Sequence, residues 1–267
     1  MRSRPEKREG SRLFRPLAVL LPLYILIPLV ALPFFITPGA LLEHLSSGMA
    51  MRALVLTIQT TLAATALCVA LGTPLAFVLA RSDFRGRDLV DTLIDLPMTI
   101  PPVVAGVALL LAFGRRGFIG EYLDLAGIQI PFTTVAVVMA QVFMASPFYV
   151  KTARAGFEAV DTKLEDVAGT LGASPWRVFW TVTVPLARPA LIAATVLAWA
   201  RSLSEFGATM MFAGNLPGRT QTLTLAVMSA MESDLDTAVA ISILSLILAL
   251  MALLVAKRLA GPGLVRF

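Results

Sequence analysis

Residues 161–185, DTKLEDVAGTLGASPWRVFWTVTVP, form a polar and basic island between two strongly apolar runs. The first half of this island predicts a short helix, because its apolar residues recur at the i, i+3, i+4, i+7 spacing of one helical face. These positions are Leu164, Val167, Ala168 and Leu171. Asp161 or Thr162 can cap the N-terminus, and Gly172 can end the helix in a left-handed conformation.

The second half of the island predicts another helix. Ser174 is a suitable N-cap, and Pro175 fits the first helical position, where its missing N–H is not needed. The apolar side chains of this helix are Trp176, Val178, Phe179 and Trp180. We expect it to run to Pro185, so the island is predicted to fold as a helix, a tight turn and a helix.

The composition of the chain is typical of a membrane protein. Of its 267 residues, 57% are hydrophobic and only 15% are charged, and the mean hydropathy of +0.82 lies outside the range of soluble proteins. The chain has one cysteine, Cys68, and one histidine, His44. This excludes a disulfide framework and any metal or catalytic site built from Cys and His. We therefore expect no metal, no cofactor and no catalytic residue.

Six apolar runs are predicted to cross a bilayer, which takes roughly 20 helical residues. The runs are 16–42, 53–80, 96–114, 125–150, 189–200 with a continuation to 218, and 237–256. We predict an all-α, polytopic membrane protein with six transmembrane helices. It would have a basic tail at 1–15 and a single transmembrane domain at 16–267. The island lies in the segment 151–188, between the fourth and fifth helices.

The distribution of Lys and Arg predicts the orientation of the chain. With the N-terminus inside, the segments 1–15, 81–95, 151–188 and 257–267 carry 17 of the 22 basic residues. Basic residues concentrate on the cytoplasmic side of membrane proteins. We therefore expect both termini and the island in the cytoplasm. This topology and contact with membrane lipid explain the net charge of +5 without nucleic acid.

Two of the predicted helices contain prolines that should interrupt them. The run 96–114 has Pro97, Pro101 and Pro102 near its start and cannot begin as a regular helix. Irregular backbone at membrane depth is tolerated where protein buries it or where it lines a watery cavity. This run is therefore either a wall of a translocation pathway or a kinked structural helix. The fourth helix is predicted to be interrupted by Ser146 and Pro147 near its inner end.

The end of the fifth run carries polar residues with more than one interpretation. Arg201 and Glu205 are four residues apart and can neutralise one another, or they can face a pathway in the outer half of the membrane. The chain continues through Gly207, Asn215, Arg219 and Thr220. This later part offers one fixed cation and several donors without a compensating acid. Such a composition suits a passing oxyanion, a docking partner or a plain polar loop.

The island resembles the cytoplasmic signature of importer-type ABC permeases: E-A-A, three residues, G, nine residues, I-x-L-P. Aligned on Gly172, the signature falls on Asp166 to Ala168 and on residues 182–185. The spacing fits throughout, but Asp166 replaces Glu, and valines replace Ala, Ile and Leu. Glu165 lies one position early, so either carboxylate could make the contact that the family makes.

In that family this segment is the coupling helix, which seats in a groove of a cytoplasmic ATPase subunit. The residues that the resemblance assigns to coupling are Glu165, Asp166, Ala168, Gly172, Ala173, Ser174, Pro175 and Pro185. The chain itself has no G-x-x-x-x-G-K-[ST] phosphate loop. We therefore expect a partner subunit to hydrolyse ATP, and the chain not to be an enzyme.

Residues 96–114, 148–161 and above all 205–227 resemble the permease subunit of molybdate importers, in the inner membrane of a prokaryote. The resemblance implies an importer for a tetrahedral oxyanion that works by alternating access. Molybdate is the first expectation, and sulfate, thiosulfate and tungstate are the alternatives. The implied complex contains two permease chains, two ATPase chains and an extracytoplasmic oxyanion-binding protein.

Three other functions fit the sequence less well. A DNA-binding helix-turn-helix at 164–180 would need polar side chains for base edges, whereas the second helix offers mainly aromatic ones. A membrane-embedded enzyme using Glu205, or Glu165 with Asp166, lacks a nucleophile, histidine or metal partner. An ion-driven secondary transporter could use the charged pair of the fifth run, but the cytoplasmic signature would then have no purpose.

Overall fold

The computed structural model describes residues 10–46 and 48–260. The helices are α1 (Gly10–Ala31), η1 (Leu32–Phe34), α2 (Pro38–Leu45), α3 (Gly48–Arg81), α4 (Arg87–Thr99), α5 (Pro102–Phe113), α6 (Gly120–Leu125), α7 (Thr134–Glu158), α8 (Thr162–Thr170), α9 (Pro175–Val178), η2 (Phe179–Thr183), α10 (Val184–Leu203), α11 (Gly207–Ala213), α12 (Leu223–Met231) and α13 (Leu235–Ala260). No strand occurs within these residues, which confirms the all-α class. Residues 1–9 of the predicted tail lie outside the described ones. α1 begins at Gly10, within the predicted tail, and the tail boundary at residue 15 stays a prediction.

Four helices are long and apolar enough to cross a membrane: α3, α7, the continuous helix Pro175–Leu203, and α13 over Leu235–Val255. Two pairs of helices meet this test only together. Ala18–Phe34 and α2 are bent by 85°, and α4 and α5 are bent by 117°. By length and composition, the described residues therefore contain four candidate spans, or up to six if each bent pair is one span. The multi-pass helical fold is confirmed, and the exact number of six stays a prediction.

α7 is one helix where an interruption is predicted. It continues through Ser146 and Pro147 to Glu158. Proline leaves the carbonyl four residues earlier without its N–H partner. Here the Ser146 hydroxyl donates to the Phe143 carbonyl oxygen at 3.5 Å, and α7 packs against α3 and α10. The helix is thus maintained by a local side chain and by its neighbours, and the predicted interruption is wrong.

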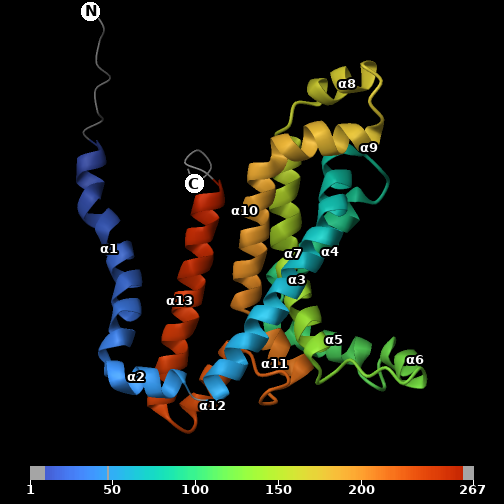
Figure 1. Cartoon of the computed structure of the whole chain (residues 1–267). Helices are drawn as coiled ribbons and strands as arrows, with labels where there is room; N and C mark the ends of the chain where they lie inside the picture. The colour runs from blue at the N-terminus through green and yellow to red at the C-terminus, as the bar shows by residue number, and fades with distance from the viewer. Residues whose placement is uncertain (1–9, 47, 261–267) are drawn as a thin grey trace, which may run out of the picture.

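The second helix of the island does not end at Pro185. α9 passes through η2 into α10, and Pro185 lies exposed within α10. The π-helical turn η2 joins α9, which lies across the end of the bundle, to α10, which runs along it (Figure 1). Of the segment predicted at 151–188, only residues 159–174 lie outside the long helices, and the extent of this segment outside the membrane stays a prediction.

The bundle has two distinct ends (Figure 1). α8 and α9 lie at one end, toward which the first turns of α1 and the last turns of α13 also point, and we name this the α8 end. α2, α11 and α12 lie at the opposite end, named the α12 end. Between them α3, α7 and α10 pack together around buried Tyr149 and Phe157. α1 stands apart from this core, and residues 18–30 are exposed.

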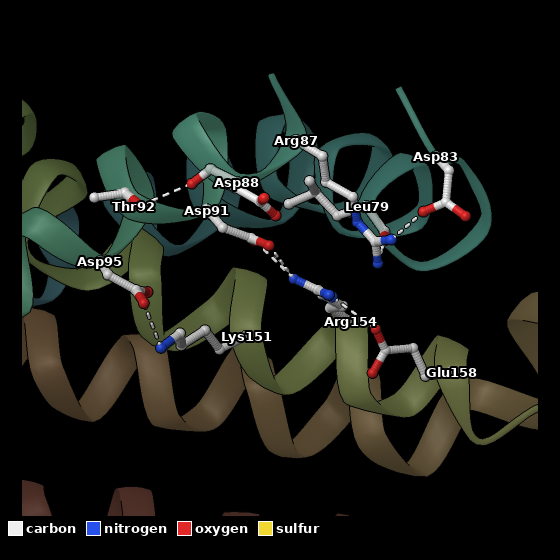
Figure 2. Close-up of polar contacts among 10 residues, drawn as sticks. All are labelled: Leu79, Asp83, Arg87, Asp88, Asp91, Thr92, Asp95, Lys151, Arg154 and Glu158. Carbon is white, nitrogen blue, oxygen red and sulfur yellow. Dashed lines mark hydrogen bonds and ion pairs between the residues drawn. The ribbon is translucent and has the colours of Figure 1, made fainter. Parts of the chain in front are cut away.

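α4 is held against α7 by charged pairs (Figure 2). Nη1 of Arg154 donates to both carboxylate oxygens of Asp91, at 2.6 and 2.8 Å. Nζ of Lys151 lies 2.8 Å from Oδ2 of Asp95. The leucines of α4 that stay exposed are Leu89, Leu93 and Leu96. α4 therefore presents acids to α7 and keeps an apolar surface for lipid or another chain.

Candidate functional site

Local capping builds the two helix starts at the α8 end. The Asp161 side chain accepts a hydrogen bond from the backbone N–H of Lys163 at 3.0 Å, directly before α8. The Ser174 hydroxyl accepts one from the backbone N–H of Arg177 at 3.4 Å, and Pro175 is the first residue of α9. Both caps satisfy donors that have no partner inside the helix. The predictions for these helix starts are confirmed.

Gly172 ends α8 in the predicted conformation. Its φ is +89°, a left-handed value that glycine adopts without strain. The N–H of Gly172 donates to the Gly169 carbonyl at 2.9 Å, and the N–H of Ala173 donates to the Ala168 carbonyl at 3.1 Å. These two bonds form a Schellman motif, which satisfies the last carbonyls of the helix. Ala168 and Ala173 therefore shape the turn through their backbone.

Glu165 is bonded directly to two other parts of the bundle, and through Arg81 to a third. Arg81, the last residue of α3, donates from Nε to Oε2 and from Nη2 to Oε1 of Glu165, both at 3.0 Å. The Thr183 hydroxyl in η2 donates to the same Oε1 at 2.6 Å. Nη2 of Arg81 also donates to the Val160 carbonyl at 3.0 Å. We name this group the Arg81 node. Sequence reasoning missed Arg81 and Thr183, because only the folded chain brings them to α8.

The neighbouring Asp166 lies on the exposed surface. No hydrogen bond or ion pair of its carboxylate occurs within the part of the chain that the structure describes. The apolar residues exposed beside it are Leu164, Val167 and Leu171. A groove of about 520 Å³, lined by residues of α8, α9 and η2, runs along this surface. An acid among exposed apolar side chains suits contact with another protein.

The predicted irregular backbone of the run 96–114 is confirmed, slightly later than expected. α4 stays helical through Pro97, and the chain breaks only at Ile100 and Pro101, before α5. A second break, at residues 204–206, separates α10 from α11. Both predicted transmembrane runs are therefore discontinuous helices.

The two breaks pack directly on one another through glycines. A Cβ at Gly207 would lie 2.9 Å from Cβ of Pro102, and a Cβ at Gly106 would lie 2.7 Å from the Ala208 carbonyl oxygen. Only residues without a Cβ allow this approach. Irregular backbone is tolerated in a membrane where protein buries it, and here each break covers the other. These contacts favour the structural interpretation of the break, and a role as a pathway wall stays a prediction.

Glu205 lies in the second break and is 1% exposed. Its Oε2 is 3.0 Å from Nη2 of Arg201. Its Oε1 accepts a hydrogen bond from the backbone N–H of Ala208 at 2.8 Å, so the carboxylate also supports the start of α11. The structure therefore shows the ion pair that the sequence allows, and a role of these two residues in facing a pathway stays a prediction.

Asn215 and Thr220 stabilise the loop that follows α11. The Asn215 amide donates to the Ser229 hydroxyl at 2.7 Å, and the Gln221 amide donates to Asn215 Oδ1 at 3.0 Å. The Thr220 hydroxyl donates to the Gly214 carbonyl at 3.1 Å. These side chains therefore join the loop to α12, and a contact with a passing ion stays a prediction.

Arg219 is the exposed cation of this loop. Its carbonyl accepts a hydrogen bond from Thr134 at 2.9 Å, whereas no ion pair of its guanidinium occurs among the described residues. It lines a cavity of about 420 Å³ together with Arg115 and Gln129. Sequence reasoning missed Arg115 as a neighbour, because it lies in a different loop. Within residues 10–46 and 48–260, no group of three or more His, Cys, Asp or Glu side chains could hold a metal ion.

Comparison with known sequences confirms the resemblance to importer-type permeases. Residues 72–264 match the family model described as binding-protein-dependent transport system inner membrane component. The molybdenum transport system permease protein ModB of Mycobacterium tuberculosis is 44% identical over 231 residues, 86% of this chain and 88% of the relative. ModB of Escherichia coli strain K12 is 42% identical over 212 residues, 78% of this chain and 93% of the relative.

Solved structures share the fold at low sequence identity. A bacterial ABC transporter involved in the import of the acidic polysaccharide alginate matches with a TM-score of 0.75 at 16% identity, over 94% of both chains. The MetNI methionine ABC transporter matches with a TM-score of 0.57 at 18% identity, over 80% of this chain and 97% of that chain. At such identities the likeness concerns the fold alone.

Proposed function

Because this chain belongs to the family of binding-protein-dependent transport system inner membrane components, we propose that it is the permease subunit of an ATP-driven importer for molybdate. The observation that carries the proposal is α8, capped at Asp161 and ended by Gly172 at φ +89°, which has the form predicted for a coupling helix. The substrate is inferred from the ModB relatives, which are named as molybdenum transport permeases. Sulfate, thiosulfate and tungstate are the alternative substrates.

The proposed partner at the α8 end is a cytoplasmic ATPase subunit, with one copy for each of two permease chains. Asp166 and the exposed apolar residues of α8 supply a surface for it, while Gly172, Ser174 and Pro175 fix the shape of that surface. This assignment places the α8 end in the cytoplasm, as the basic segments of the sequence predict. Closure of the ATPases on ATP would then move the two α8 ends together.

The proposed neighbour of α1 is a second copy of this chain. Residues 18–30 of α1 are exposed, and the main contacts of α1 are with η1, the helix that follows it directly. An apolar helix in a membrane protein packs against protein or lipid. A homodimer would cover part of α1, and membrane lipid would cover the rest.

The cavity beside Arg219 is proposed to receive the oxyanion from an extracytoplasmic binding protein. The residues that line it include Arg115, Arg219 and Gln129. Guanidinium groups match the geometry of oxyanions. Since both arginines are exposed, water screens them and the affinity stays low. Weak binding favours release, so specificity would rest with the binding protein.

Reconstitution tests the proposed function. The chain is placed in liposomes with its co-purifying ATPase and binding protein, and molybdate, tungstate and sulfate are compared for uptake and for stimulation of ATP hydrolysis. Molybdate is expected to give the largest response. A larger response to sulfate would make the molybdate assignment wrong. Uptake that persists without ATP, driven by the membrane potential, would assign the chain to the ion-driven secondary transporters.

The proposed substrate cavity has a matched control. Arg219→Glu is expected to lower molybdate uptake about fivefold, because the new carboxylate repels the anion. Arg116→Glu makes the same charge change at an exposed loop residue that does not line the cavity, and it should change uptake less than about twofold. Equal effects of the two variants would remove the cavity from the proposed route.

A further inference from the structure

The caps of α8 are local and do not attach this helix to the rest of the bundle. α8 buries none of its residues. Its large apolar side chains do not enter the core: Leu164, Val167 and Leu171 are 50%, 56% and 83% exposed. The groove of about 520 Å³ is lined by α8 together with α9 and η2, so packed side chains do not fill the space between them. Hydrophobic packing therefore contributes little to the position of this helix.

The side-chain contacts that do fix α8 converge on Glu165. Its two oxygens accept the bidentate pair from Arg81 at 3.0 Å and the Thr183 hydroxyl at 2.6 Å. The side chains of Arg81 and Glu165 are 14% and 15% exposed, so water competes little for these bonds. Bidentate, charge-assisted hydrogen bonds of this kind fix geometry as well as contribute energy.

The Arg81 node connects α8 to the ends of three long helices. Arg81 ends α3, Thr183 lies directly before α10, and Val160, whose carbonyl accepts from Arg81 at 3.0 Å, follows the end of α7. A displacement of α8 at this point acts on α3, α7 and α10 together. Polar networks with several partners resist partial separation more than single pairs do.

We infer that Glu165 is a positioning residue that transmits the movement of α8 to α3, α7 and α10, and that it does not contact the ATPase. This inference rests on the proposed function and assigns different roles to the two adjacent carboxylates. Residues i and i+1 on a helix point about 100° apart. Glu165 therefore faces the bundle while Asp166 is exposed for the partner subunit.

The complete importer in liposomes tests the inference with a series of variants. Glu165→Gln removes the charge at nearly constant size, and Thr183→Val removes one hydrogen bond but keeps the ion pair. We expect the ATPase to co-purify with both variants as with the wild type. The ATP hydrolysed per molybdate imported should rise about tenfold for Glu165→Gln and about threefold for Thr183→Val. Asp166→Asn should instead weaken co-purification of the ATPase.

A distance measurement separates positioning from general stability. Spin labels at cysteines replacing Thr170 and Arg85, both exposed, report the distance between α8 and the loop after α3. Cys68 is 1% exposed and stays unlabelled. Glu165→Gln should broaden this distance distribution at least about twofold, and Asp166→Asn should leave it unchanged.

Different results would overturn the inference about Glu165 and the proposed function. Loss of ATPase co-purification in Glu165→Gln would make Glu165 a partner contact and overturn the inference. An unchanged coupling ratio or an unchanged distance distribution in folded Glu165→Gln would overturn it as well. Absence of ATP-dependent uptake in the wild type would instead overturn the proposed function, while the distance measurement would still report whether Glu165 positions α8.

Discussion

At the α12 end, the polar side chains of Glu205, Asn215 and Gln221 are bonded to neighbours within the same region. At the α8 end, by contrast, α8 leaves most of its side chains to solvent, and its side chains reach the bundle through the Arg81 node. A closed network of buried bonds resists movement. An exposed helix fixed at one point can be bound by a partner and displaced as a unit. We therefore interpret the α12 end as a rigid scaffold and α8 as the element that transmits movement.

The largest effect is expected from a substitution at the α12 end, where the two interrupted helices pack against one another. Gly106→Val would place a side chain against the backbone of Ala208, whose carbonyl oxygen lies 2.7 Å from the Cβ position. Backbone cannot move aside as a flexible side chain can. We therefore expect a loss of more than about 3 kcal/mol in the free energy of unfolding. The yield of folded protein and its thermal unfolding in detergent measure this loss.

The matched substitution lies in α8. A Cβ at Gly169 meets no heavy atom within 4 Å, so Gly169→Val should change the free energy of unfolding by no more than about 1 kcal/mol. If the two valine variants unfold alike, the contrast in packing between the two ends is wrong.

The second expected effect concerns the buried ion pair of the rigid end. Glu205→Gln keeps an acceptor for the Ala208 N–H but leaves Arg201, which is 21% exposed, without its counter-charge. Because Arg201 retains some access to water, we expect a destabilisation of about 2 kcal/mol rather than the full cost of an isolated buried charge. Thermal unfolding of the purified chain measures it.

An exposed pair at the same end serves as the control. Arg115 and Asp124 are separated by 3.9 Å, and their side chains are 68% and 42% exposed. Asp124→Asn should cost less than about 0.5 kcal/mol. A cost equal to that of Glu205→Gln would show that burial does not distinguish these two pairs.

The third effect sharpens the description of the transmitting end. Gly172 needs its φ of +89° and has open space around it. Gly172→Val should therefore strain the turn by about 1–2 kcal/mol without a clash, whereas Gly172→Asn adopts the left-handed conformation more easily. We expect membrane insertion to be normal in both variants. The ATP hydrolysed per molybdate should rise in the valine variant only, and equal coupling in both would separate the turn from coupling.

Locally specified features of this chain are predictable from its sequence. The caps at Asp161 and Ser174 and the helix end at Gly172 depend on residues a few positions away. They lie where the sequence places them. The apolar runs likewise predict the long helices, because burial in lipid demands a minimum length of apolar chain.

The features that sequence reasoning missed depend on distant contacts. Arg81 and Glu165 are 84 positions apart, and Thr183 is 18 positions from Glu165. No local spacing indicates that these residues meet. The continuity of α7 through Pro147 similarly depends on packing against α3 and α10. The difference between Glu165, which is bonded to the bundle, and Asp166, which is exposed, is therefore seen only in the folded chain.

The smallest expected effect concerns pH and the start of α13 at the α12 end. Asp234 accepts hydrogen bonds from the backbone N–H groups of Asp236 at 3.1 Å and Thr237 at 3.3 Å. The Thr237 hydroxyl is the main cause that lowers the pKa of the Asp234 carboxyl below its usual value, and the backbone N–H groups and the nearby His44 lower this pKa further. A lowered pKa contributes stability above the usual carboxyl range, and this contribution is lost as the pH falls through the lowered pKa, below about pH 4.

Thr237→Val removes the main cause of that shift. The drop in the thermal unfolding midpoint between about pH 6 and about pH 3 should therefore be smaller in this variant than in the wild type. All other carboxyl groups are common to both proteins, so their contributions to the drop cancel in the comparison. Thr92→Val is the control, because the Thr92 hydroxyl donates to the backbone carbonyl of Asp88 and not to a carboxylate. An equal drop in wild type and Thr237→Val would mean that Asp234 does not stabilise the start of α13 through its charge.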